Sequence, residues 1–191
     1  MKIEVVEDNE KVFRFKLSGA TNWYVNTLRR IAINNVKTFA IDKVTFYENT
    51  GAMFDEYIAH RIGLIPLLTP SKGYSDADEI LFTLEADGPK TVYSGELQSA
   101  DKEVKVANGN IPLIKLAAEQ RIRLEGKAVM GVGMKHAKFQ PGLVTYGGPQ
   151  EGAYEVYVES FGQMPPREMI NKAFDAITGE IKDVAKEVKK L

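Results

Sequence analysis

An apolar repeat near the C-terminal end constrains the fold of this sequence most. Between residues 166 and 188, large apolar side chains recur at spacings of four, three, four, three and four, with lysine and glutamate between them. This pattern predicts one long helix with a coiled-coil-like stripe. The stripe consists of Ile170, Phe174, Ile177, Ile181, Val184 and Val188.

This stripe is too apolar to remain in water. Burying six such side chains is worth on the order of 9 to 18 kcal/mol before opposing terms, whereas domains have a net stability of about 5 to 15 kcal/mol. Pro165 and Pro166 suit the helix start, and Gly179 weakens the helix interior by about 1 kcal/mol relative to alanine. We therefore expect the stripe to pack on a sheet of its own chain, on a partner, or on both.

A second organised stretch covers residues 21–67. Thr21 or Asn22 can cap a helix that begins at Trp23 and ends before residue 35, and a strand over 36–47 follows. The apolar phase of this strand slips at Asp42 and Lys43, which predicts a bulge or a crossing point there.

The same stretch continues with a short helix over 53–62 and an extended edge or docked loop over 64–67. Gly63 stands where a left-handed helix cap is expected. The apolar side of the short helix is predicted to hold Phe54, Tyr57, Ile58 and Ile62.

The remaining chain reads mainly as strands and loops. Period-two patterns predict strands over 3–6, 12–17, 80–85, 91–97, 120–134 and 154–158. Residues 70–78 and 101–110 are polar and turn-prone, and the glycine- and proline-rich stretch 135–149 is expected to be a domain boundary.

Several motifs in this order resemble the alpha-like assembly subunits of cellular RNA polymerases, and they are most similar to the archaeal branch of that family. They are residues 26–30 (Asn-Thr-Leu-Arg-Arg), 40–44, 47–50, 55–67, 111–116 and 136–142. The resemblance extends over the whole length. No single motif would be specific enough to carry it.

The resemblance and the composition of 135–149 together imply an α+β chain with two domains. Residues 1–47 and 145–191 are expected to form a discontinuous dimerisation domain, an antiparallel sheet with two helices. Residues 48–144 are expected to form an inserted, mostly-β domain.

The resemblance also implies the partners. The dimerisation domain would pair with the small polymerase subunit L, and the chain would dock the large catalytic subunits and other small assembly subunits. We expect the apolar helix faces to form the heterodimer interface, through Leu28, Ile31, Phe174, Ile177, Ile181, Val184 and Val188.

Charged residues give candidate contacts to the large subunits. Arg29 and Arg30 are adjacent on a helix and point about 100° apart, so they can serve different partners, although two solvated arginines would look the same. The resemblance assigns a large-subunit contact to Arg30. His60 and Arg61 form either an interface cluster or ordinary helix-face charges.

A small basic group consists of Lys135, His136 and Lys138, beside Phe139. It could touch phosphate, but a surface loop or a protein contact explains it better, and Lys138 is a candidate contact to the large subunits. With 25 basic and 26 acidic residues the net charge is -1, so the chain lacks the positive field of a protein that grips nucleic acid alone. Bacterial relatives carry a DNA-binding domain beyond the assembly domain, and since this sequence ends directly after the long helix we expect none here.

Catalysis by the chain itself is not expected. It has no cysteine, so no cofactor such as a thiolate zinc site or a cysteine-ligated iron-sulfur cluster is expected, although some archaeal relatives carry a cluster-binding module. Glu56 and His60 share a helix face, and His136 is the only other histidine, but no zinc-protease or phosphate-loop motif is present. The nucleotidyltransferase activity would belong to other chains of the complex.

We expect a cytoplasmic location, because no segment resembles an export signal or a membrane span. A different class of protein remains open: a free-standing homodimeric α+β scaffold that uses the same helical stripe on a second copy of itself.

Overall fold

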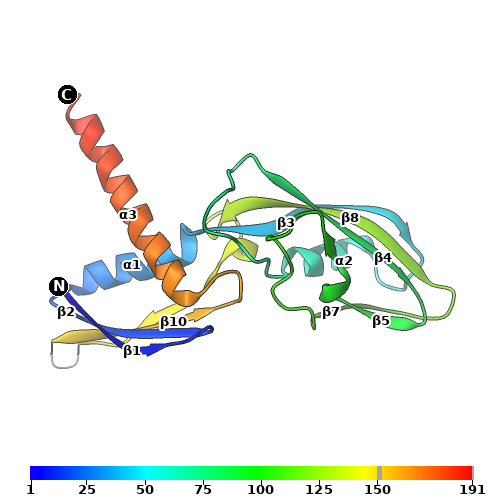
Figure 1. Cartoon of the computed structure of the whole chain (residues 1–191), viewed down its shortest axis with the longest axis horizontal. Coiled ribbons are helices and arrows are strands. Elements are labelled where there is room, and N and C mark those ends of the chain that lie inside the picture. The colour runs from blue at the N-terminus through cyan, green and yellow to red at the C-terminus, as the bar shows by residue number, and fades with distance from the viewer. Residues whose placement is uncertain (150–151, 191) are drawn as a thin grey trace. The chain divides into compact units, whose positions relative to one another are not determined.

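A computed structural model of the chain describes residues 1–149 and 152–190 (Figure 1). The chain forms two compact units, of which unit 1 is Met1–Lys37 with Val132–Leu191 and unit 2 is Thr38–Gly131. Both units combine antiparallel sheets with helices, so the predicted α+β class is confirmed.

Unit 1 has one four-stranded antiparallel sheet in the order β1-β2-β10-β9. The strands are β1 (Lys2–Asp8), β2 (Val12–Ser18), β9 (Gly142–Tyr146) and β10 (Ala153–Ser160). Alternation places Phe13, Phe15 and Leu17 of β2 on the buried face, as the sequence pattern predicts.

Two helices cover the buried face of this sheet. They are α1 (Asn22–Asn34), which packs on β9, and α3 (Pro166–Val188), which packs on β10, β2 and α1. The Thr21 hydroxyl accepts the backbone N–H of Tyr24 at 3.3 Å and caps α1, and Pro166 occupies the first turn of α3. Beyond the sheet, the second half of α3 extends away from the described strands of unit 1 (Figure 1).

Unit 2 has a four-stranded sheet in the order β3-β8-β4-β6 and a two-stranded sheet β5-β7. Its strands are β3 (Lys37–Asn49), β4 (Glu79–Asp87), β5 (Lys90–Tyr93), β6 (Gln98–Ser99), β7 (Pro112–Leu116) and β8 (Arg121–Val132). Helix α2 (Asp55–Gly63) buries Ile58 and Ile62 in the core of this unit, beside Phe39, Ile41 and Phe82.

The unit boundaries lie after Lys37 and after Gly131. Both are earlier in the sequence than the predicted domain boundaries after residues 47 and 144. Strand β3 runs unbroken through Asp42, but Phe39 and Ile41 already belong to the core of unit 2, which begins at Thr38. At the second boundary, unit 1 resumes at Val132 because Met134 donates its backbone N–H to the carbonyl of Asn34 at the end of α1.

Several local expectations were wrong. Residues 135–149 are not only a boundary, since they contain the short 3-10 helix η2 (Ala137–Phe139) and strand β9. The strand expected over 91–97 ends at Tyr93, where the 3-10 helix η1 (Ser94–Glu96) begins. Gly63 is not a left-handed cap: it is the last residue of α2, and Leu64 caps the helix in a right-handed conformation.

Candidate protein-interaction surfaces

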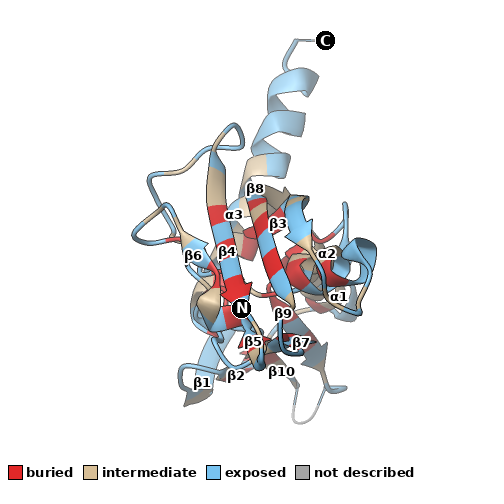
Figure 2. Ribbon diagram, turned by 90° about the vertical axis from the view of Figure 1, so that its right-hand side faces the viewer, coloured by how far each residue is buried: buried red, intermediate tan, exposed pale blue. Residues whose placement is uncertain are grey.

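The stripe of α3 divides into a packed half and an exposed half. Ile170 is buried, and Phe174 and Ile177 pack against the core of unit 1. Ile181, Val184 and Val188 are exposed by 63%, 64% and 61%. We call these last three residues the α3 seam. The end of α3 toward the C-terminus is accordingly coloured as exposed in Figure 2.

The contribution of α1 differs from the expected one. Leu28 is fully buried in the core of unit 1, so the structure places it among core residues rather than on a surface, and Ile31 is half-buried against the same core. At the end of α1, Asn35 Nδ2 donates to Glu180 Oε1 at 3.2 Å, which ties α1 to α3 just before the seam begins.

Sequence reasoning missed a further apolar surface on β1. Ile3 and Val5 lie opposite Leu17 and Phe15 of β2, so they point to the same face of the sheet, yet both are exposed. The signal was present, because a strand that alternates glutamate with isoleucine and valine has one apolar face.

Arg29 and Arg30 have different surroundings, as their 100° separation predicts. The Nε and Nη2 groups of Arg29 donate to Asn26 Oδ1 at 3.2 and 3.1 Å, one turn earlier on α1. Arg30 is exposed. The guanidinium of Arg29 is therefore positioned by its own helix, while that of Arg30 faces solvent.

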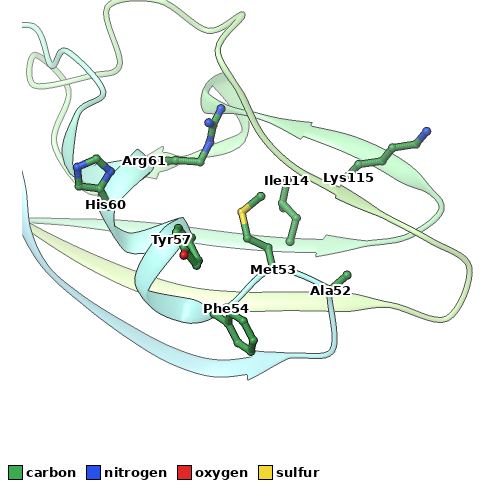
Figure 3. Close-up of a pocket in the computed structure, with 8 residues that line it drawn as sticks. All are labelled: Ala52, Met53, Phe54, Tyr57, His60, Arg61, Ile114 and Lys115. Carbon is green, nitrogen blue, oxygen red and sulfur yellow. The ribbon is translucent and has the colours of Figure 1, made fainter.

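A groove lies between α2 and β7, with a volume of about 620 Å³ (Figure 3). Met53, Phe54, Tyr57 and Ile114 form its apolar lining. The expected apolar side of α2 was thus only half correct, because Ile58 and Ile62 are buried whereas Phe54 and Tyr57 are exposed. We call this the α2–β7 groove.

Three basic residues also line the α2–β7 groove: His60, Arg61 and Lys115. His60 and Arg61 are exposed, and the Nη2 group of Arg61 donates to the carbonyl of Pro112 at the start of β7. The structure therefore brings together His60 and Arg61 with a third base, Lys115, which the sequence did not single out.

The basic group at 135–138 is organised around a buried ring. The Nζ atoms of Lys135 and Lys138 lie 5.8 and 5.2 Å from the ring centroid of Phe139, and His136 Nδ1 accepts the backbone N–H of Lys138 at 3.1 Å. These contacts hold the η2 turn in place, which favours a structural role or a protein contact over a phosphate site.

A hydrogen bond between Tyr74 and Asp101 joins two loops of unit 2. Burial and the hydroxyl's 2.9 Å bond to the carboxylate raise the pKa of Tyr74 to about 12. The backbone N–H groups of Val104 and Glu103 lower the pKa of Asp101. Because Tyr74 also meets the ring of Phe39 edge-on, at 5.4 Å between centroids, this pair fastens both loops to the core.

Neither a metal site nor a membrane span emerges from the described residues. No group of three potential metal-ligating side chains occurs within 1–149 and 152–190. Over the same ranges, no helix has the length and apolar character needed to cross a bilayer.

Both units thus leave apolar side chains exposed, on the α3 seam in unit 1 and in the α2–β7 groove in unit 2. Residues 31–144 match the family described as the RNA polymerase Rpb3/RpoA insert domain, and the chain belongs to this family. The resemblance of the sequence motifs is thereby confirmed.

Curated relatives are similar over most of this chain. Proteins named DNA-directed RNA polymerase subunit Rpo3 are 45% identical over 152 residues in both Pyrococcus furiosus and Thermococcus kodakarensis, covering 76% of this chain. The subunit Rpo3 of Methanocaldococcus jannaschii is 44% identical over 161 residues, 84% of this chain and 82% of the relative. The chain spans 58% and 59% of the length of the first two.

Proposed function

We propose that this chain is a non-catalytic assembly subunit of an archaeal DNA-directed RNA polymerase, in the cytoplasm. Unit 1 pairs with the small subunit L, and the chain then docks the large catalytic subunits and other small subunits. The name shared by its relatives supports the assignment to a DNA-directed RNA polymerase. The exposed α3 seam supports the proposal that the chain acts by binding a partner subunit.

The seam carries this proposal because three large aliphatic side chains in one line are the kind of exposed surface that marks a protein interface. In the heterodimer, Ile181, Val184 and Val188 would be covered by subunit L, with Phe174 and Ile177 at the margin. Exposed Ile3 and Val5 offer a second apolar strip on the same face of the sheet as α1 and α3.

Contacts to the large subunits are assigned to basic residues, of which Arg30, His60 and Arg61 are exposed and Lys138 is half-buried. Arg30 is the first candidate, since its planar guanidinium faces solvent and can hold a carboxylate or two carbonyls. His60 and Arg61 on α2, Lys138 on η2, and Arg29, whose guanidinium is held by Asn26, are further candidates.

Co-expression with and without the candidate subunit L tests the proposal, with the mass read by size-exclusion chromatography and light scattering. We expect a one-to-one complex that the double variant Ile181→Glu/Val184→Glu abolishes. The control Lys186→Gln/Lys190→Gln makes the same change in net charge away from the seam, at Lys186 on the opposite side of α3 and at Lys190 just after the helix, where both lysines form exposed ion pairs.

The control variant should leave the complex intact. If the chain instead forms a stable homodimer that ignores subunit L, the seam pairs with a second copy, and the scaffold interpretation replaces the polymerase subunit.

A further inference from the structure

The walls of the α2–β7 groove are fixed by polar contacts within unit 2. Asn49 Nδ2 donates to Asp55 Oδ1 at 2.6 Å and to the Met53 carbonyl at 2.9 Å, which sets the turn that leads into α2. At the other end of α2, Arg61 bonds the carbonyl of Pro112. The groove is therefore preformed, and a ligand need not order it on binding.

Close packing at the turn supports the same conclusion. A Cβ atom on Gly51 would lie 2.9 Å from Ile114 Cδ1 and 3.1 Å from Asn49 Oδ1. Glycine lets this turn approach β7 without displacing the side-chain ends of Ile114 and Asn49, and that approach places Met53 and Phe54 along the groove (Figure 3).

The aromatic residues of the groove favour a polypeptide over a small molecule. Phe54 and Tyr57 are exposed by 71% and 65%, with ring centroids 6.4 Å apart. A small-molecule site usually encloses its ligand, whereas protruding aromatic side chains anchor protein interfaces. The occupant should thus bring an apolar side chain that fits between these rings and Ile114.

The basic residues of the groove indicate which charge the bound segment should carry beside its apolar side chain. His60, Arg61 and Lys115 line the groove, and within the described ranges no carboxylate does. Of the two acidic residues in the first turn of α2, Asp55 is engaged by Asn49 and Glu56 is not part of the groove lining. A carboxylate beside the apolar anchor would therefore meet three bases in the groove itself.

We propose that the α2–β7 groove docks a short segment of another polymerase subunit, in which an apolar anchor residue is flanked by one or more carboxylates. This proposal rests on the proposed function and specifies the chemistry of one docking contact. It also adds Met53, Phe54, Tyr57 and Lys115 to the residues that recognise a partner.

Photo-crosslinking in the reconstituted polymerase tests the identity of the occupant. The photoreactive residue p-benzoylphenylalanine replaces Tyr57 in the groove or, as a control, the exposed Tyr93 of β5, and mass spectrometry locates the crosslinked peptide. We expect a crosslink from position 57 to an apolar residue of another subunit with an acidic residue within a few positions. A basic or uncharged segment, or no crosslink from position 57 in the assembled enzyme, overturns the proposal.

Competition against the unchanged chain during reconstitution measures how much the groove contributes. Phe54→Ser and Lys115→Glu should each lower incorporation roughly tenfold, while Phe54→Leu and Lys115→Arg restore it. Because both side chains are exposed, the variants should fold normally, which circular dichroism verifies. Equal incorporation of all four variants would contradict the proposed contact.

These experiments separate the two proposals. A chain that enters the polymerase through the seam but is indifferent to the groove variants refutes the groove contact alone. A chain that enters no polymerase complex with subunit L present refutes the proposed function, and the groove contact fails with it.

Discussion

The first and second halves of α3 carry the same apolar repeat, but their side chains end in different environments. Ile170 is buried under the sheet of unit 1, whereas Ile181, three steps of the repeat further along, is 63% exposed. The repeat thus marks an apolar face along the whole helix, while the sheet beneath covers only its first half. The difference teaches that spacing identifies which side chains need covering, and the length of the sheet decides which of them the chain covers itself.

In unit 2, by contrast, the chain covers all the aliphatic residues on the inner face of its helix α2. Both aliphatic residues of the inner face of α2, Ile58 and Ile62, are fully buried by the chain's own core. The exposed apolar side chains here are aromatic, Phe54 just before α2 and Tyr57 within it, and they lie along a groove rather than along a straight helical stripe. The comparison therefore separates two kinds of surface, a helical seam in unit 1 and an aromatic groove in unit 2.

The largest effect is expected at the packed half of α3. Ile170→Ala removes a buried side chain from the core of unit 1 and should lower the free energy of unfolding by about 2 to 5 kcal/mol. Urea denaturation followed by circular dichroism measures this loss in the isolated chain. If the loss were below that of an exposed substitution, the first half of the stripe would not be packed as described.

The sequence predicted the elements whose pattern is local. The capped helix after Thr21, the alternation of Phe13, Phe15 and Leu17, and the proline-initiated α3 all follow from short-range rules, and the structure contains them. The candidate interface was less predictable, because helical spacing shows only that Leu28 and Ile181 both lie on an apolar helix face, and both were therefore assigned to the interface. Only the position of the sheet shows that one is core and the other is surface.

The α2–β7 groove was hidden from the sequence for a different reason. Its wall joins Phe54 and Tyr57 to Ile114 and Lys115, which are more than fifty residues away in the chain. The helical pattern of 53–62 predicted all four apolar residues on one side, but Phe54 precedes the first turn and its backbone is extended. Contacts of this range depend on strand pairing that no local pattern specifies.

The next effect concerns the glycine at the transition between the two halves of α3. Gly179 lies in the helix interior, and a Cβ atom there would meet nothing within 4 Å. Gly179→Ala should raise the stability by about 0.5 to 1 kcal/mol, because alanine loses less backbone freedom on folding. Thermal unfolding and helix content by circular dichroism measure the gain.

A suitable control is Gly179→Pro, which should remove the helical signal of the second half. If Gly179→Ala changed neither helix content nor stability, the second half of α3 would not be helical before its partner binds.

A smaller effect is expected where unit 2 fastens its loops. The raised pKa of Tyr74 means that its bond to Asp101 stabilises the protein fully below the usual tyrosine pKa of 10.0 and is lost as the pH rises through about 12. Tyr74→Phe should therefore lower the urea midpoint near neutral pH, and the difference from the unchanged chain should vanish above pH 12. Equal urea midpoints of the two chains near neutral pH would mean that the packing against Phe39, which phenylalanine retains, holds the loop without the hydrogen bond.

The smallest effect on the isolated chain is expected at the seam. Ile181→Ala removes a side chain that is mostly in water already, so the free energy of unfolding should change by no more than about 0.5 kcal/mol. The same substitution should weaken the complex with subunit L, because there the side chain would be buried. Denaturation of the isolated chain and titration of subunit L into it measure the two quantities side by side. A loss of stability as large as that of Ile170→Ala would show that the chain covers Ile181 itself, and the contrast between the halves of α3 would disappear.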